Sequence, residues 1–116
     1  MYKIFAFLSK REGMTMQQFI DYYENNHVPL ICSLAPIPPV YKRRYVVREE
    51  EFTHSGSTVD FDVITETNFA DKDAFLAWIA KISLPGAGEQ VLADETNFLD
   101  RSRTRAYVID EHITSE

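Results

Sequence analysis

Cysteine is almost absent from this chain of 116 residues, because Cys32 is the only one. A single cysteine cannot form an intramolecular disulfide bond, so we expect a reducing compartment and a cytoplasmic protein. No neighbouring residue would activate the Cys32 thiol, and a packing role is favoured over a nucleophilic one.

The short motifs of nucleotide and metal sites are also missing: there is no GxGxxG, Walker loop, CxxC or HExxH. Glu24 and His27 do have the E-x-x-H spacing of iron-binding carboxylate proteins. Such sites need a second copy of the motif and further glutamates on facing helices, which this chain does not offer. We therefore expect no metal and no organic cofactor.

Long hydrophobic runs are lacking as well, and so is a cluster of basic residues of the kind that binds nucleic acid. The apolar runs are too short to span a membrane, and the apolar run within residues 1–13 is too short for a signal peptide. Twelve Lys and Arg residues stand against eighteen Asp and Glu, which gives a net charge of −6. We expect neither a membrane nor a nucleic acid as a partner.

What the chain does contain is enough apolar sequence for one core, with 45% hydrophobic and 13% aromatic residues. Residues 1–116 are expected to form a single domain. Asp71 and Thr15 are suited to cap helices, and a polar segment over residues 50–57 suggests a hairpin connection. The predicted strands cover residues 2–9, 40–49, 58–67 and 104–110, and the predicted helices begin at residues 15, 71 and 88. The order β-α-β-β-α-β, with an extra small helix before the last strand, predicts an α+β, ferredoxin-like protomer.

The first and last predicted strands are apolar on both faces, as in residues 2–9, YKIFAFLS. A sheet that is covered by helices on one side only should alternate apolar and polar residues. The second face therefore needs a cover, and a second copy is the simplest one. We expect a homodimer that packs through its sheet faces.

The segment from Thr15 to Pro29 predicts an amphipathic helix that ends in a titratable ring. Gln18 follows Thr15 at capping-box spacing. Pro29 is expected to end or kink the helix, because it forces the preceding residue away from the α region. The apolar positions recur at helical intervals, and His27 is the next position on their stripe; they are Met16, Phe19, Ile20 and Tyr23.

His27 is the main candidate catalytic residue, because an inward ring at a helix end can face a ligand in a hollow between helices and sheet. A core histidine bound to a carbonyl or carboxylate is the alternative. Asp62 and Glu66 lie on a predicted central strand, where burial of a carboxylate is costly. They either pair with Arg43 or Arg44 of the next strand or are exposed where the sheet frays, or one of them orients His27 or relays a proton. Asp62 is taken as the second catalytic candidate. The candidate substrate-binding residues are Tyr22, Tyr23, Tyr45, Glu66, Trp78 and Tyr107, although core packing is the favoured interpretation for Trp78 and is common for strand tyrosines.

Three stretches resemble the EthD-like branch of the dimeric α/β-barrel proteins. The first is Arg11-x-Gly13-Met14-Thr15 followed by Phe19, Tyr23, His27 and Pro29. The second is Asp62-x-x-x-Glu66-x-x-Phe69. The third, which is similar to the fungal subgroup in particular, is Ala93-Asp94-Glu95, then Asn97 to Asp100, then Thr104 to Val108.

This resemblance implies a ferredoxin-like protomer, a homodimer whose sheets form a barrel, and a pocket in each protomer. It also implies action without metal or organic cofactor on an aromatic or polyketide-derived carbonyl compound, with His27 at the family's acid–base position. The resulting hypothesis is a lyase, a decarboxylase or a dehydratase, acting on an aromatic polyketide acid. A cofactorless oxygenase or cyclase and a non-catalytic small-molecule-binding dimer remain open, as does a weaker haem-handling alternative.

Overall fold

The computed structural model describes residues 1–52, 54 and 56–116 of the chain. The strands are β1 (Tyr2–Leu8), β2 (Val40–Tyr45), β3 (Val63–Phe69) and β4 (Arg105–Ile109). The helices are α1 (Met16–Tyr22), α2 (Val28–Leu34), α3 (Lys72–Ile82) and α4 (Ala87–Phe98). A π-helical turn, Tyr23–His27, joins α1 to α2, and short 3-10 turns lie at Arg48–Glu50 and Arg101–Arg103. Among the described residues, no helix has the length and apolar character to cross a membrane.

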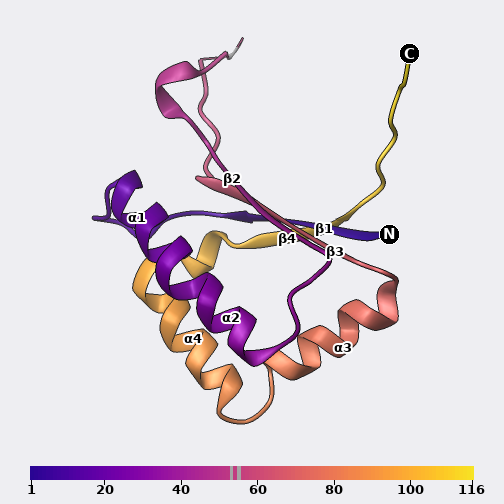
Figure 1. The fold of residues 1–116 in the computed structure, drawn as a ribbon. Helices are drawn as coiled ribbons and strands as arrows, with labels where there is room; N and C mark the ends of the chain where they lie inside the picture. The colour runs from indigo at the N-terminus through magenta and orange to yellow at the C-terminus, as the bar shows by residue number, and fades with distance from the viewer. Residues whose placement is uncertain (53, 55) are drawn as a thin grey trace.

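The four strands form one antiparallel sheet in the order β2-β3-β1-β4. The four α-helices, α1 to α4, all lie on one side of this sheet, whereas the 3-10 turn at Arg48–Glu50 belongs to the β2–β3 connection, which projects beyond the other side (Figure 1). The predicted α+β, ferredoxin-like protomer is therefore confirmed, with β1 and β3 central as that topology requires.

The first helix begins as predicted, but it does not end at Pro29. The Thr15 side chain accepts a hydrogen bond from the Gln18 backbone, and the Gln18 side chain accepts one from the Thr15 backbone. Pro29 occupies the first turn of α2, where a missing N–H is tolerated. Val28 keeps right-handed helical angles and its N–H donates to the Tyr23 carbonyl, five residues back. The π turn thus carries the chain past the proline, and the expected helix end was wrong.

The β2–β3 connection begins earlier and ends later than predicted. β2 stops at Tyr45 and β3 starts only at Val63, so both strands differ from the predicted ranges 40–49 and 58–67. The Arg48 guanidinium donates to the carbonyls of Val59 and Phe61, at 3.0 and 2.6 Å. The Arg48 side chain therefore binds the segment before β3, for which the sequence pattern had predicted strand pairing. Part of the predicted 50–57 hairpin, residues 53 and 55, lies outside the described residues.

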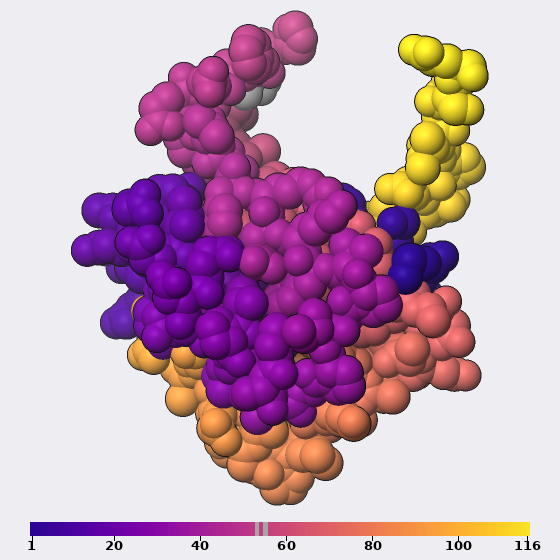
Figure 2. Space-filling model, in the orientation of Figure 1, coloured from indigo at the N-terminus to yellow at the C-terminus, as the bar shows by residue number. Residues whose placement is uncertain are grey.

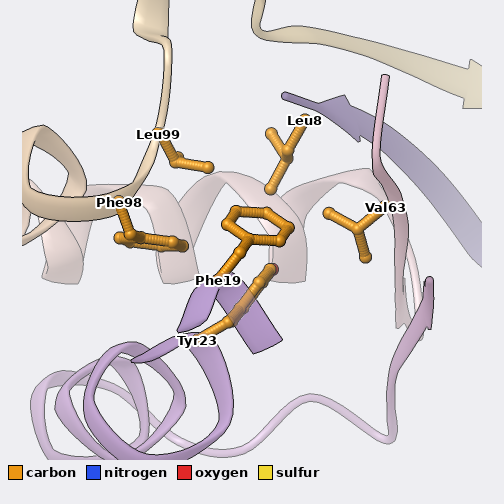
Figure 3. Packing of buried hydrophobic residues seen from close by; sticks show 6 residues of the cluster. All are labelled: Leu8, Phe19, Tyr23, Val63, Phe98 and Leu99. Carbon is orange, nitrogen blue, oxygen red and sulfur yellow. The ribbon is translucent and has the colours of Figure 1, made fainter. Parts of the chain in front are cut away.

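The centre of the core lies between the first helix, the end of α4 and the sheet (Figure 3). Phe19 and Tyr23 project from the helix toward Leu8 of β1 and Val63 of β3, and Phe98 and Leu99 close the cluster from the end of α4. Burial of this aromatic surface is the main favourable term that fixes the helix on the sheet.

The opposite face of the sheet, called the open face below, carries the alternate residues of each strand. Phe5 and Phe7 of β1 lie beside Tyr107 and Arg105 of β4 on this face. Two segments project beyond it: the β2–β3 connection and the C-terminal tail, residues 110–116 (Figures 1 and 2).

Candidate functional site

His27 is the last residue of the π turn, and its side chain is directed into the protein. The residue is 6% exposed. Its ring lies 5.3 Å from the Tyr23 ring and 5.0 Å from the Phe98 ring, measured between centroids. The extra residue that a π turn inserts shifts the helical face, and π turns are frequent at functional sites. The sequence prediction of an inward His27 ring is confirmed, although the helix continues past it into α2.

A carboxylate from α4 holds the His27 ring. The Nδ1 atom of His27 lies 2.8 Å from an oxygen of Asp94. The Tyr22 hydroxyl donates to the other Asp94 oxygen at 2.7 Å, and the Asn97 amide donates to the Tyr22 oxygen at 2.9 Å. These four side chains, from the first helix and from α4, form one continuous chain that is called the Asp94 network below.

The Asp94 network assigns different roles to the two ring nitrogens of His27. An ionised carboxylate only accepts hydrogen bonds, so Nδ1 must carry the proton that is shared with Asp94. The Nε2 atom has no hydrogen-bond partner among the described residues, and it is not among their fully buried unpaired atoms. Nε2 is therefore the atom that can accept or donate a proton to a bound molecule.

The two tyrosines beside His27 are poor bases. Burial, followed by the hydrogen bond to Asp94, raises the pKa of the Tyr22 phenol. Burial also raises the pKa of Tyr23 to about 12, although the contact with Thr65 opposes this shift. The Tyr23 hydroxyl lies 2.6 Å from the Thr65 hydroxyl. Both phenols stay protonated near neutral pH, so their part in any chemistry is restricted to hydrogen bonding.

Glu24 belongs to a second cluster on the β2 side of the helix. It accepts two hydrogen bonds from the Arg43 guanidinium, at 2.6 and 2.9 Å, and one from the Tyr45 hydroxyl at 2.6 Å. The bond from Arg43, aided by the one from Tyr45, lowers the pKa of the Glu24 carboxyl despite burial, which would raise it. The carboxylate of the E-x-x-H spacing is thus paired with Arg43. Among the described residues, no group of three or more His, Cys, Asp or Glu side chains is placed to hold a metal ion.

Asp62 and Glu66 are both buried, but neither is the carboxylate that bonds His27. Asp62 accepts from the Lys10 backbone N–H at 2.8 Å and from Arg48 at 3.0 Å. Glu66 accepts from Arg44 at 2.8 Å, as the cross-strand pairing alternative had predicted. The expectation that Asp62 or Glu66 orients His27 was wrong, because Asp94 holds this position.

Glu66 lies on the open face of β3, as its pairing opposite Phe5 shows. Burial would raise the pKa of its carboxyl, but the hydrogen bonds from Arg44 and Asn68 outweigh burial and the pKa is lowered. Tyr107 is on the same face and is 55% exposed. The sheet therefore separates Glu66 and Tyr107 from His27, while Tyr45 lies on the helix side and packs against Phe19 and Tyr23.

Trp78 lines a different hollow from the one expected beneath His27. An apolar cavity of about 340 Å³ lies between α3 and the proline loop that follows α2. The Trp78 indole N–H donates to the Pro36 carbonyl at 3.1 Å, which fixes the loop to α3. Pro36 follows His27 by nine positions of the chain, or roughly 13 Å at helical rise. His27 lines neither this cavity nor the other four described for the protein.

Asp94 is the partner of His27 that sequence reasoning did not identify. It lies 67 positions from His27, and no local spacing joins the two. A signal did exist, because Asp94 stands one helical turn before the buried Phe98 and therefore on the same inward face of α4. A carboxylate on an inward helical face requires a partner, and an inward histidine is one candidate for it.

Comparison with known proteins gives a fold match along the whole chain. A crystal structure of an ethyl tert-butyl ether D (EthD) family protein from Bacillus halodurans matches with a TM-score of 0.65 at 20% identity, covering 97% of this chain and 99% of that one. An Arabidopsis thaliana protein matches with a TM-score of 0.65 at 16% identity over 100% of both chains. A dimeric ferredoxin-like protein of unknown function from Thermobifida fusca matches with a TM-score of 0.53 at 14% identity, covering 93% and 88%. No curated protein matches.

A family model provides the closer assignment. The model of the EthD domain matches residues 11–102, a range that includes His27, Asp94 and the whole core cluster except Leu8. The chain belongs to the EthD domain family.

Proposed function

We propose that this protein is a cofactor-independent lyase, a decarboxylase or a dehydratase, that acts on an aromatic polyketide carbonyl or carboxylic acid. The observation that carries the proposal is the Asp94 network, in which a partly buried carboxylate fixes Nδ1 of His27 at 2.8 Å. Nε2 is left as the one free ring nitrogen in an aromatic environment. This is the arrangement that general acid–base catalysis requires of a histidine.

The chemistry follows from a substrate that provides its own electron sink. In a β-keto acid, the bond between the α-carbon and the carboxylate breaks, CO₂ leaves, and the electron pair becomes an enolate. Protonated His27 donates a hydrogen bond from Nε2 to the enolate oxygen and stabilises its charge. Nε2 then transfers its proton to the α-carbon, and His27 takes a new proton from water.

Dehydration of a β-hydroxy carbonyl compound uses the same atom in the other direction. Nε2 of neutral His27 removes the α-proton, and the imidazolium then gives this proton to the β-hydroxyl, which leaves as water and restores neutral His27. Asp94 stabilises the imidazolium in both cases, because its carboxylate stays on Nδ1. Asp94 is a positioning residue in this scheme. Asp62 immediately precedes β3 and is bonded to Lys10 and Arg48, and no step of this scheme is assigned to it.

A homodimer through the open faces is part of the proposal. The open face carries Phe5, Phe7 and Tyr107, and an exposed apolar sheet face of this kind is suited to association. One of the structural neighbours is described as dimeric, which is consistent with such an assembly.

A non-catalytic small-molecule-binding protein is the second candidate, and the position of the apolar cavity favours it. That cavity offers Trp78, Phe69 and the proline loop to a flat apolar guest, yet it lies away from His27. Under this alternative, a ligand binds there unchanged and His27 is only structural. A cofactorless oxygenase or cyclase would use the same histidine and differs only in its product.

Incubation of the pure protein with a panel of aromatic polyketide acids, followed by mass spectrometry, separates these candidates. We expect a product lighter by CO₂ or by water, formed by the wild type and by a Glu95→Gln surface control, but not by His27→Gln. A product that gains oxygen indicates an oxygenase, and a product of unchanged mass and new structure indicates a cyclase. Tight binding with no conversion of any compound in the panel would refute the lyase.

A further inference from the structure

The cavity beside Trp78 has walls that hold it open without a ligand. It lies between α3 and the loop that joins α2 to β2, and its volume is about 340 Å³ (Figure 1). Three of the four loop residues that line it, 36–39, are prolines, and the proline ring fixes the backbone angle φ. The Trp78 indole N–H donates to the Pro36 carbonyl at 3.1 Å and so ties the loop to the helix. This hollow, called the Trp78 cavity below, is therefore formed in the unliganded protein.

Two small residues of α3 leave the space that the Trp78 cavity occupies. Ala74, Ala77, Trp78 and Lys81 line it from the helix, at the spacing of a single helical face. The Trp78 ring packs against the Phe69 ring, with 5.4 Å between centroids, and Phe69 is almost fully buried. A flat ring that enters the cavity meets aromatic surface, which favours stacked or edge-on packing of a second aromatic group.

Lys81 is the one charged residue among those that line the Trp78 cavity. It follows Trp78 by three positions, so the two side chains are neighbours on the surface of α3. Lys81 is exposed, and among the residues that the structure describes its ammonium has neither an ion pair nor a hydrogen bond. An ammonium group beside an apolar hollow complements a ligand that carries a negative charge on an apolar body.

The remaining lining restricts the ligand further. Apart from Lys81 and the Trp78 N–H, which is already bonded to Pro36, every lining side chain is apolar. A sugar or a nucleotide would lose its hydrogen bonds to water here and gain few in return. The volume of about 340 Å³ is at the lower end for small-molecule sites, which span roughly 300–1,000 Å³. The cavity therefore suits one or two fused rings and not a larger ring system.

We propose that the Trp78 cavity binds a planar aromatic carboxylate of one or two rings. The ring packs against Trp78 and Phe69, and the carboxylate pairs with the Lys81 ammonium. Burial of the ring provides most of the affinity, because an exposed ion pair contributes little by itself. The inference rests on the site named for the second candidate function, to which it adds the ligand class and the role of Lys81. It does not depend on chemistry at His27.

Trp78 is the only tryptophan of the chain, so its indole N–H gives a single signal that reports on this cavity. Titration of the wild-type protein with 2-naphthoate, followed by nitrogen–proton NMR, should shift this signal saturably. The uncharged 2-naphthamide has the same rings, and we expect it to bind about 2- to 5-fold more weakly, as the loss of an exposed ion pair predicts. No saturable shift with 2-naphthoate would overturn the proposal, and equal affinities would overturn the pairing with Lys81.

Variants of α3 test the two contacts separately. Lys81→Gln should lower the affinity for 2-naphthoate to that for 2-naphthamide, whereas Lys72→Gln removes an exposed lysine that does not line the cavity and should change neither. Ala74→Leu should fill the cavity and weaken both compounds by roughly 10-fold or more, because their rings lose buried surface. Ala80→Leu is the control, since Ala80 is exposed and does not line the cavity. Ala77→Leu fills the same space and takes the place of Ala74→Leu if that variant does not fold. Wild-type affinity in a folded variant with a filled cavity would put the compounds elsewhere and overturn the proposal.

The titrations and the lyase test have separate outcomes. If 2-naphthoate does not bind, this inference fails, while conversion of the acid panel by the wild type and not by His27→Gln still supports the lyase. If no acid of the panel is converted, the lyase fails, and the titrations still decide whether the Trp78 cavity binds an aromatic carboxylate.

Discussion

Replacement of Asp94 by alanine is the perturbation that most directly probes the network around His27. The substitution leaves two donors without their acceptor, the Nδ1–H of His27 and the Tyr22 hydroxyl. A hydrogen bond to a charged group contributes about 1.5–3 kcal/mol, and an unpaired buried donor costs a similar amount. The His27 side chain is almost fully buried, so water cannot replace the hydrogen bond that it loses and the full cost applies. The half-buried Tyr22 hydroxyl can turn toward water, so its lost hydrogen bond costs less.

The expected result is a loss of about 2–4 kcal/mol in the free energy of unfolding for Asp94→Ala. Asp94→Asn keeps an oxygen for Nδ1 and should lose only about 1 kcal/mol. Urea denaturation at neutral pH and fixed protein concentration measures both. Glu95→Ala is the control, because its partner Arg101 lies at the surface and such pairs contribute less than about 1 kcal/mol. A loss below about 0.5 kcal/mol for Asp94→Ala would refute the network.

The tautomer of His27 provides a second test, because a general loss of stability would not change which ring nitrogen carries the proton. Because Asp94 accepts from Nδ1, the neutral ring should carry its proton on Nδ1 and leave Nε2 bare. Long-range nitrogen–proton NMR spectra distinguish the two tautomers. A proton on Nε2 of the neutral ring in the wild-type protein would contradict the assignment of Nε2 as the reactive atom.

Three further predictions concern the scaffold. Phe98→Ala removes a fully buried ring that contacts both Tyr23 and His27, and it should cost about 3–5 kcal/mol in urea denaturation. Thr15→Ala removes a capping box and should cost about 1 kcal/mol in the same assay, with Thr15→Ser close to wild type. Glu24 has a pKa below its ordinary 4.5 in the folded state, so its stabilising contribution is complete above that pH and is lost as the pH falls through the lower folded value. Glu24→Gln should therefore lose less stability than the wild type on acidification below about pH 4.5, and equal losses would contradict the pairing with Arg43.

The fold could be predicted because each element carried its own signal. The capping box at Thr15 and the Asp71 cap fixed the starts of two helices, and the structure has both. Pro29 misled the prediction, because a proline normally ends a helix and nothing in the local pattern marks a π turn. Before β3 starts at Val63, Arg48 donates hydrogen bonds to the backbone of Val59 and Phe61, a contact that no periodicity in the sequence indicates.

The site was predicted only in part, for a related reason. His27 could be found because it continues an apolar stripe within one helix. Its partner Asp94 comes from another helix that is distant in sequence, and Asp62 was chosen instead because it lay on a strand expected to be central. Tertiary packing decides which carboxylate contacts the histidine. A single sequence does not show this packing when several acidic residues could occupy the position.

The turnover of His27→Ala on an aromatic β-keto or β-hydroxy acid that the wild type converts is the most direct test of the central claim. A single acid–base group typically contributes about 10²–10⁴-fold, so kcat should fall by that factor while the oligomeric state and the thermal unfolding remain those of a folded protein. Conversion by His27→Ala at the wild-type rate would contradict the account, because it would remove the imidazole from the mechanism.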